Sequence, residues 1–466
     1  MMAGMNLLDL NGDVFAYILP LLSTATLRDL SETCHDAHNL TTPHLISSVI
    51  LNRDRGQVSS FCRFMLANSP LRIPLLHSLT IADGACTILY PEADQLVVDV
   101  SFASLVADVV SQASNLIHLS ISHTEDMIRV DSRIVQSLIH SCPRLTSVSF
   151  RRMGPYSVQM MRRLHSLRSA TLDLSGDFSP VLRPFHLTLQ NLAITGNSRN
   201  QEFLDLDLTW PHVRTLSIMR VFTSRARLAR SFPNISRLEI HAETLDGYRM
   251  LHRNVENSTS WSHLDHVKGN CIALYFLGIS CPIRHLELTD RLYSIPVGET
   301  SPWEPVLHME EKYLVVIQAT SPSVLSFNAE ASLNTHFYTQ LVPLVPRLRF
   351  LHLNIEEIDR NNETVTVLNK LPSILAQLPV VYLSLHCQGQ LAPFQLSDLD
   401  FQKRLIVAFV RLVSSLQFIE LAWEQAGWKC SWWESISRHD SQGREMVEIS
   451  EYMGQLARKK WAATNG

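Results

Sequence analysis

Residues 210–240 read WPHVRTLSIMRVFTSRARLARSFPNISRLEI, and this stretch contains the same phrase twice. The phrase is aromatic-Pro-x-apolar-x-x-Leu-x-Ile, and its copies span 210–218 and 232–240, a spacing of 22 residues (232 − 210 = 22). Leu216 and Ile218 alternate as residues of a β-strand do, so both side chains point to one side. The repetition predicts two equivalent strands, one in each copy.

The segment between the two copies has the pattern of a short amphipathic helix. Leu228 and Phe232 are four residues apart and share one helical face, while three arginines lie on other faces. Pro211 and Pro233 stand just before the two strands, where proline stops a helix and favours extended backbone. One strand and one short helix cannot bury both of their apolar sides alone, so the unit must be stacked on copies of itself.

The strand phrase apolar-x-x-apolar-x-apolar occurs along most of the chain. Thirteen copies begin at Leu76, Leu116, Leu145, Leu167, Leu189, Val213, Ile235, Leu264, Ile283, Val324, Leu348, Val380 and Leu416. Their mean spacing, (416 − 76)/12 or about 28 residues, is typical of leucine-rich repeats. The pattern predicts an α/β fold, a leucine-rich-repeat solenoid or horseshoe with a parallel sheet on its concave face and helices outside.

The composition is that of a folded protein without a strong charge. Of the 466 residues, 46% are apolar and 18% are charged, and the net charge is −4. These values exclude a disordered chain and give no sign of a nucleic-acid-binding surface. No apolar run approaches the roughly 18 residues that span a bilayer, and the N-terminus lacks a secretory signal pattern. The eight cysteines are scattered without a CxxC pair, so we expect reduced thiols in a cytoplasmic and/or nuclear protein.

The first fifty residues have the pattern of two short helices separated by Ser23 and Thr24, because apolar residues recur three or four positions apart on either side. The stretch resembles an F-box of the fungal type. The residues that carry the resemblance are Leu10, Asp13, Ile18, Leu19 and Leu22 in the first half and Leu27, Leu30, Thr33 and Cys34 in the second. It departs from the family pattern at Asn11, where the family has proline, and at Pro20, which removes a hydrogen bond inside the expected first helix.

The resemblance implies a non-catalytic role as the substrate-recognition subunit of a cullin-type (SCF) E3 ubiquitin ligase. The N-terminal helices would bind the small adaptor protein that bridges to the cullin, and the repeats would bind an unidentified protein target on their concave face. The apolar residues expected to make or support the adaptor contact are Leu10, Val14, Ile18, Leu22, Leu27 and Leu30. The alternative is a non-catalytic repeat scaffold with a vestigial F-box, which the two departures favour.

Residues between the buried positions of each strand phrase are expected on the concave face. In the middle of the chain they form a mixed-charge patch of Arg237, Glu239, His241, His285 and Glu287. In the last three repeats they include the residues that we predict to bind the target, Phe350, His352, Tyr382, His386, Phe418 and Glu420. Exposed aromatic side chains with polar neighbours are typical of binding hot spots. The alternative is that the C-terminal tail or an inserted loop folds over them.

No catalytic, cofactor or metal motif is recognisable in the sequence. G-x-S-x-G, H-E-x-x-H, P-loop and G-x-G-x-x-G patterns do not occur. Cys34, His35 and His38 are close together, but the F-box resemblance implies that Cys34 is a packed helix residue rather than a ligand. His386 and Cys387 are adjacent on a strand and face opposite sides, so they cannot readily bind one ion. We therefore expect no catalytic residue, no metal, no cofactor, and no nucleic-acid or membrane partner.

The chain divides into four predicted parts. Residues 1–55 form the F-box-like helical module, 56–75 a linker helix, 76–425 the repeats, and 426–466 a Trp-rich C-terminal cap with a tail. A solenoid exposes the apolar side of its last unit unless a cap covers it. The expected cap residues are Trp423, Trp428, Trp432 and Trp433, with an exposed patch for a partner as the alternative. From 444 to 460 we expect a polar helix followed by a frayed tail.

Overall fold

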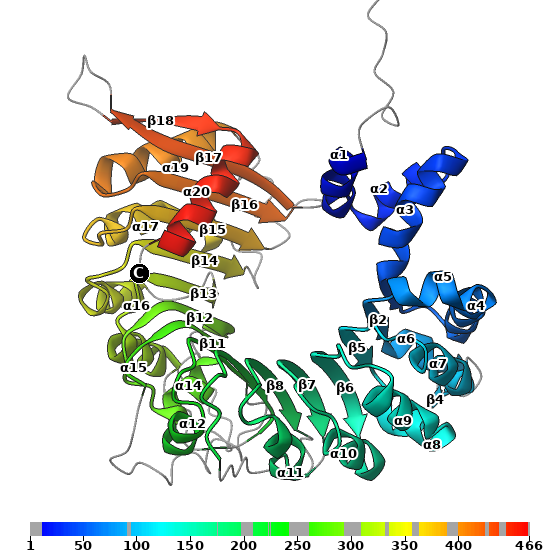
Figure 1. Cartoon of the computed structure of the whole chain (residues 1–466). Helices are drawn as coiled ribbons and strands as arrows, with labels where there is room; N and C mark the ends of the chain where they lie inside the picture. Colours follow the sequence, from blue (N-terminus) through cyan, green and yellow to red (C-terminus); the bar gives the residue numbers. More distant parts are fainter. Residues whose placement is uncertain are drawn as a thin grey trace, which may run out of the picture. The chain divides into compact units, whose positions relative to one another are not determined.

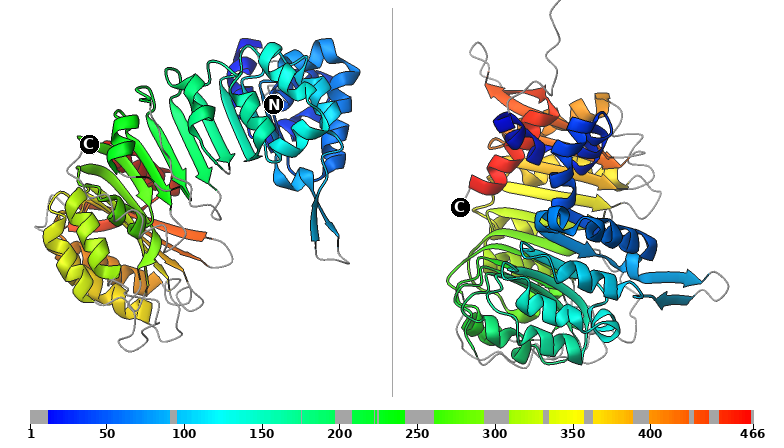
Figure 2. Two further views of the ribbon diagram at one scale, coloured as in Figure 1. Left: turned by 90° about the horizontal axis from the view of Figure 1, so that it is seen from below. Right: turned by 45° about the vertical axis from the view of Figure 1, so that its right-hand side comes forward.

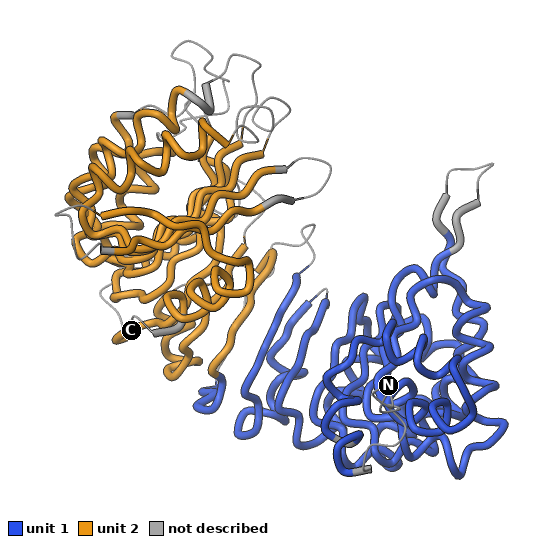
Figure 3. The backbone as a smooth tube through the Cα atoms, turned by 90° about the horizontal axis from the view of Figure 1, so that it is seen from above, with its two compact units in different colours: residues 1–213 blue, residues 214–466 orange. Residues whose placement is uncertain are grey.

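The computed structural model describes residues 12–90, 95–174, 176–196, 208–221, 223, 225–241, 261–292, 309–330, 335–356, 363–388, 399–424, 428–437 and 444–464. Its two compact units are Met1–Val213 (unit 1) and Arg214–Gly466 (unit 2), coloured separately in Figure 3. In both units strands alternate with helices along the chain, and most of the described strands are parallel to their neighbours. The fold class is therefore α/β with long, mostly parallel, open sheets.

Unit 1 contains a parallel sheet in which the spatial order of strands follows the chain order. Six of its described strands are hydrogen-bonded in the order β1-β2-β5-β6-β7-β8 (Figure 1). Their bounds are Ser48–Leu51 (β1), Ser78–Ile81 (β2), His118–Ile121 (β5), Ser147–Met153 (β6), Ser169–Leu174 (β7) and Asn191–Gly196 (β8). Outside this sheet, β3 (Thr87–Tyr90) and β4 (Gln95–Val98) pair antiparallel with each other.

The helices of unit 1 supply the crossovers that parallel neighbours need. Their bounds are Gly12–Ile18 (α1), Leu19–Leu21 (η2), Thr24–Ser31 (α2), His35–Ser47 (α3), Arg55–Ala67 (α4), Ser69–Arg72 (α5), Ile73–Leu75 (η3), Asp83–Cys86 (α6), Ala103–Val110 (α7), Thr124–Val130 (α8), Arg133–His140 (α9), Pro155–Met161 (α10), Ser179–Leu182 (α11) and Arg183–Phe185 (η4). In α9, Ile134 and Leu138 are one turn apart and both buried, as the amphipathic pattern requires.

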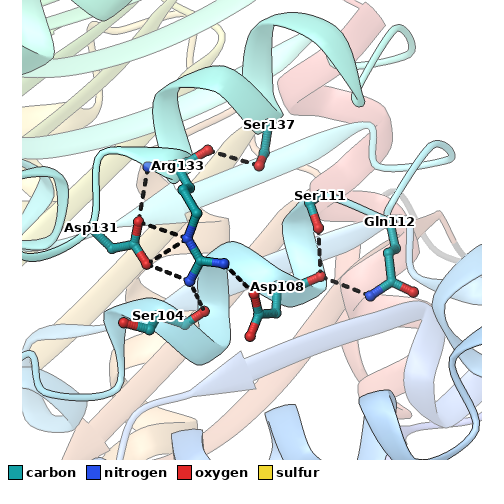
Figure 4. A network of polar contacts seen from close by, with 7 residues as sticks. All are labelled: Ser104, Asp108, Ser111, Gln112, Asp131, Arg133 and Ser137. Atoms are coloured by element: carbon teal, nitrogen blue, oxygen red, sulfur yellow. Dashed lines mark hydrogen bonds and ion pairs between the residues drawn. The ribbon is translucent and has the colours of Figure 1, made fainter.

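A polar network joins two of these helices, α7 and α9 (Figure 4). Nη1 of Arg133 donates to Asp108 at 2.7 Å, and Nη2 lies 2.6 Å from a carboxylate oxygen of Asp131. The Arg133 side chain is exposed, and solvent screens an ion pair of this kind. The network therefore fixes the spacing of the two helices more than it stabilises the fold.

Unit 2 continues the alternation and ends in an antiparallel pair of strands. The parallel strands are Thr215–Met219 (β9), Arg237–His241 (β10), Leu264–Gly269 (β11), Ile283–Leu292 (β12), Val324–Glu330 (β13), Phe350–Glu356 (β14), Tyr382–Gln388 (β15) and Phe418–Glu424 (β16). Trp428–Ser437 (β17) then pairs antiparallel with β16, and Arg444–Ile449 (β18) pairs antiparallel with β17. The helices are Arg225–Ser231 (α12), Cys271–Leu277 (α14), Met309–Thr320 (α15), Thr335–Leu341 (α16), Val342–Leu344 (η6), Glu363–Leu375 (α17), Leu399–Leu412 (α19) and Glu451–Thr464 (α20).

The parallel registers bring equivalent residues of the repeated phrase side by side. Leu216 pairs with Leu238 and Ile218 with Ile240, as the 22-residue repeat predicts. All four side chains are buried, and each contributes about 1.5–3 kcal/mol of hydrophobic stabilisation. Each of the thirteen strand phrases lies on a described strand, from β2 and then β5 through β16. The predicted positions of these strands are therefore confirmed.

The copy of the phrase at Leu264 lacks its third apolar residue, and the packing of strands gives the reason. Gly269 of β11 stands at that position and pairs with Ile240 of β10. A Cβ atom on Gly269 would lie 2.3 Å from the carbonyl oxygen of Ile240. Neighbouring backbone therefore approaches too closely for a side chain, and glycine is required here.

Three segments differ from the sequence-based prediction. In the described part of residues 1–55, the α-helices α1, α2 and α3 stand where two were expected, and β1 follows them and pairs with β2, so the parallel sheet begins before residue 76. β3 and β4 were not predicted. Residues 444–449, predicted as the start of a helix, form β18, and the helix begins only at Glu451. Each of these strands is too short for the period of its apolar residues to decide between strand and helix, so the pairing partner decides.

Candidate functional site

The sheet of unit 2 has two unlike faces. The described helices α14, α15, α16, α17 and α19 cover one face, and α20 lies against the other (Figures 1 and 2). We call the face against which α20 lies the inner face. It carries the residues that stand between the buried leucines of the strand phrases, because side chains alternate across a strand.

A row of one valine and three aromatic residues, termed the aromatic row, crosses four strands of the inner face. The parallel register places Val324, Phe350, Tyr382 and Phe418 directly beside one another on β13 to β16. The rings of Phe350 and Tyr382 are stacked, with centroids 4.6 Å apart and an interplanar angle of 3°. Tyr382 and Phe418 are also stacked, at 6.0 Å and 22°. The sequence thus located three aromatic side chains that the structure brings together.

A polar row lies two residues further along the same strands. Its members are Glu287, Ser326, His352, Ser384 and Glu420, in register from β12 to β16. The Ser384 hydroxyl donates to Glu420 Oε2 at 2.8 Å, so it must accept from Nδ1 of His352, which lies 2.9 Å away. The last three members, His352, Ser384 and Glu420, therefore form a chain of hydrogen bonds that ends on the Glu420 carboxylate.

Glu420 is the best-satisfied group of the inner face. Its side chain is only 1% exposed, and it also accepts from the Tyr382 hydroxyl at 3.3 Å and lies 3.1 Å from Nε2 of His386. The guanidinium of Arg458, from α20, lies 3.0 Å from Oε1. The buried carboxylate therefore has a formal positive charge as partner, which a buried anion needs if it is to stay ionised.

The neighbours of the carboxylate fix the protonation states of the site. Burial alone raises the pKa of Glu420, but the hydrogen bond with His386 and the charge of Arg458 outweigh burial and bring the pKa below its ordinary value. Burial, then the nearby charges of His386 and Arg458, lowers the pKa of His352 to about 3. At neutral pH Glu420 is therefore an anion and His352 is a neutral donor.

α20 covers the aromatic row and the Glu420 end of the polar row. Phe350, Tyr382 and Trp432 are buried in one cluster with Val324, against which Ala457 and Trp461 of α20 pack. The ring of Trp461 lies 6.4 Å from that of Phe418. Arg284 of β12 donates to the carbonyl oxygen of Ala462 at 2.7 Å. The aromatic row is thus not an open surface, and the alternative that the C-terminal tail folds over it describes the structure.

The predicted target-binding residues therefore separate into two groups. Phe350 is 4% exposed, Tyr382 is 1% exposed, and Glu420 is fully buried beneath α20. His352, His386 and Phe418 remain half-buried. The α20 side chains that complete the site, above all Arg458 and Trp461, were not predicted. Their spacing of three residues, with Gly454 and Ala457 on the same helical face, was the available signal.

At the β11–β12 end of the inner face, His266, His285 and Glu287 have ligand atoms within 4.8 Å of one another. The imidazoles of His266 and His285 are stacked at 4.4 Å, and burial and the neighbouring charge of His266 lower the pKa of His285 to about 4. These residues could hold a divalent cation. However, the ammonium of Lys268 lies 2.8 Å from Glu287 Oε1 and opposes a second positive charge at the carboxylate.

The two other groupings considered for metal binding have structural roles. Cys34, predicted as a packed helix residue, is instead exposed and stands just before α3, where its sulfur accepts a hydrogen bond from the backbone N–H of Ala37 at 3.5 Å. Cys387 is buried on the face of β15 opposite to His386, which lies against Glu420. Neither grouping brings its members to one point.

The N-terminal helices form a small core of their own. Phe15, Leu19 and Leu27 are buried together, and Leu22, Leu30 and Leu45 pack against them. Leu27 therefore supports this module from inside its core, whereas Leu22 and Leu30 are only partly buried. Ile18 is half-buried, and Leu10 lies outside the described residues.

Among the described residues of this module, three apolar side chains form an exposed stripe. Val14, Tyr17 and Leu21 are 40%, 79% and 83% exposed, and their spacing of three and four residues places them on one side of α1 and η2. Of these, only Val14 was predicted. Pro20 lies in η2, so α1 ends at Ile18 and the proline interrupts no α-helical hydrogen bond.

No protein-family model matches the chain, and no curated protein matches it. Within the described residues, none of the helices has both the length and the apolar character that a membrane-spanning helix needs. The function is therefore inferred from the inner face and the N-terminal module.

Proposed function

We propose that the chain is the substrate-recognition subunit of a cullin-type ubiquitin ligase. In this proposal the N-terminal helices are an F-box that binds the adaptor, the strand–helix units are leucine-rich repeats, and the inner face binds a protein target. The observation that carries it is the exposed stripe of Val14, Tyr17 and Leu21 on a module whose own core is closed. A folded helical module has no internal use for such a stripe, and an apolar partner surface would cover it.

The chemistry of this role is positioning. The inner face would hold a target so that another subunit transfers ubiquitin to it, and the contribution of this chain is a raised effective concentration. The polar row supports a binding role, because the Ser384 hydroxyl beside His352 is fully buried and donates a hydrogen bond to Glu420. A nucleophilic serine would instead donate to the histidine and face a substrate.

The first test is co-purification of the adaptor with the full chain. The double variant Tyr17→Asp and Leu21→Asp should lose the adaptor, because two charges would be buried against its apolar surface, at a cost of several kcal/mol. Leu187→Asp is the matched control, since Leu187 is 61% exposed in the same unit and lies outside the module. A wild-type chain that captures no adaptor, or a double variant that captures as much as the control, would count against the proposal.

The choice of variant matters because the apolar residues of the module differ in burial. Leu22→Asp together with Leu27→Asp would place charges in the core with Phe15 and Leu19, so the module would unfold and the adaptor would be lost for an uninformative reason. The exposed stripe avoids this, and circular dichroism of the Tyr17 and Leu21 double variant should match that of the wild type.

A repeat scaffold with a vestigial F-box is the second candidate. The observation that favours it is the length of α1, which has seven residues and is followed at Leu19 by a 3-10 turn that contains Pro20. Such a short helix offers little contact area. In this case the chain would still bind its target through the inner face, but adaptor and cullin would be absent from the purified complex.

A further inference from the structure

We propose that the inner face of β13–β16 is a helix-binding site that α20 occupies in cis, and that its ligand in trans is an amphipathic helix with an arginine followed three residues later by a large aromatic side chain. This inference rests on the target-binding half of the proposed function and is independent of adaptor docking. The contacts of α20 define the chemistry of the ligand. Because the carboxylate of Glu420 is buried, the ligand must carry a cation beside it.

The face of α20 that meets the sheet has a regular spacing. Gly454, Ala457, Arg458 and Trp461 lie at positions i, i+3, i+4 and i+7, which is one side of a helix. A Cβ atom on Gly454 would lie 2.1 Å from the Trp432 ring, and Ala457 packs on the cluster of Phe350 and Tyr382. Small residues at two positions thus let the helix axis approach the sheet closely.

The demand for a cation comes from Glu420. Its carboxylate is fixed by Ser384 and Tyr382 hydroxyls, and Arg458 is the guanidinium beside it. A buried anion that loses its countercharge is strongly unfavourable, so an occupant without a cation at this position would not bind. A guanidinium is weakly hydrated and binds carboxylates in a defined geometry, so arginine suits the site better than lysine.

The demand for an aromatic side chain comes from the end of the aromatic row. Phe418 is only half-buried, and the Trp461 ring covers it at a centroid distance of 6.4 Å. Stacked or tilted aromatic pairs add about 0.5–1.5 kcal/mol beyond their buried area. Arg284, which donates to the carbonyl of Ala462, then receives the C-terminal end of the helix.

Several properties make α20 a displaceable occupant. It has 14 residues, and an isolated helix of that length is only marginally stable in water. Its outer side is exposed at Tyr452, Met453 and Leu456, so only one face holds it to the sheet. Its advantage over a ligand in trans is covalent attachment through β18, which gives a high effective concentration.

The experiment uses the full chain and a fluorescent peptide of residues 451–464. In the wild type, α20 competes in cis and the peptide should bind weakly. The full-length variant Arg458→Glu should release α20 because the introduced carboxylate repels that of Glu420, and the peptide should then bind about tenfold or more tightly, as expected when an intramolecular competitor is removed. Lys459→Glu is the matched control, since it makes the same charge change on an exposed side of the same helix.

Two further measurements keep the outcome interpretable. Amide hydrogen exchange of residues 451–464 should rise in Arg458→Glu and not in Lys459→Glu, while β14 and β15 stay protected in both, which shows that the sheet remains folded. A peptide carrying Arg458→Glu, or one carrying Trp461→Ala, should bind the full-length Arg458→Glu variant much more weakly than the wild-type peptide does.

The inference would be overturned if exchange of α20 rises in Arg458→Glu and the released inner face still fails to bind the wild-type peptide. It would also be overturned if Arg458→Glu and Lys459→Glu behave alike, because the carboxylate would then not select the occupant. The α20 variants lie outside the N-terminal module and should leave adaptor co-purification unchanged. A failure of the helix-binding inference is therefore distinct from a failure of the adaptor-binding proposal.

Discussion

Glu420 accepts hydrogen bonds from Ser384 and Tyr382 and lies against His386 and Arg458, so fixed donors replace the water that would solvate a carboxylate. Such a group is stable as an anion only while its partners stay in place. His352 extends the arrangement, because its Nδ1 must donate to Ser384 for Ser384 to donate to Glu420. The individual residues of the inner face are therefore coupled by their protonation states.

We expect unit 2 to lose stability as the pH falls below 6.5, because His352 must stay neutral in the folded chain. Burial, followed by the charges of His386 and Arg458, lowers its pKa from 6.5 to about 3. Between these values His352 binds a proton in the unfolded chain but not in the folded chain, so this residue alone lowers stability by about 1 kcal/mol per pH unit. Urea unfolding at pH 7, 6 and 5 measures the slope.

His352→Gln should make this pH profile flatter, although not flat, because the lowered pKa of His285 acts in the same direction. His263→Gln is the control, since its side chain is 63% exposed. Equal slopes in the wild type and in His352→Gln would show that the polar row does not hold His352 neutral.

At the scale of an element, the strands of the repeats could be predicted from the sequence, but the strands that belong to no repeat could not. Leu216 and Ile218 predict a strand because their period-2 alternation recurs 22 residues later. The register of β9 and β10 confirms, residue by residue, that the two strands are equivalent. β18 has no repeated copy, and Arg444 to Ile449 becomes a strand only because β17 pairs with it. The pairing of β18 with β17 depends on tertiary structure, so the local sequence pattern cannot predict it.

Gly269 gives the sharpest test of packing between strands. Alanine normally stabilises the middle of a strand by about 0.5–1 kcal/mol relative to glycine. Here the new Cβ would lie 2.3 Å from the Ile240 carbonyl oxygen, so Gly269→Ala should instead destabilise the fold by about 1–3 kcal/mol. Thermal unfolding decides between the two signs, and a raised midpoint would contradict the close approach of β10 and β11.

The candidate site was also predictable in part. Phe350, Tyr382 and Phe418 could be placed side by side from the strand phrases alone, and the structure stacks them. That α20 covers them could not be derived, because it depends on the path of the chain through β17 and β18. In the N-terminal module, helical spacing identified apolar residues but not which of them the neighbouring helices bury, and so Leu27 was grouped with Val14.

At the scale of the whole molecule, the order of strands determines how far a local change can spread. In each unit a strand is hydrogen-bonded to the strands before and after it in the repeat order, and its buried residues lie in rows with those of its neighbours. Stability in such a chain is approximately a sum over repeats and their nearest-neighbour contacts. Opening should therefore propagate from a damaged strand to adjacent strands before it reaches distant ones.

Two matched cavity variants test this nearest-neighbour behaviour. Leu385 of β15 and Leu119 of β5 are both fully packed, at 1% and 0% exposure, and truncation to alanine should cost each about 2–5 kcal/mol. Hydrogen exchange should rise in β14, β15 and β16 for Leu385→Ala, with β2, β5 and β6 unchanged, and the reverse should hold for Leu119→Ala, because each leucine supports only the strands that pair with its own. A uniform rise across both units in either variant would mean that the chain unfolds as one cooperative body, and the repeats would then not be energetically independent neighbours.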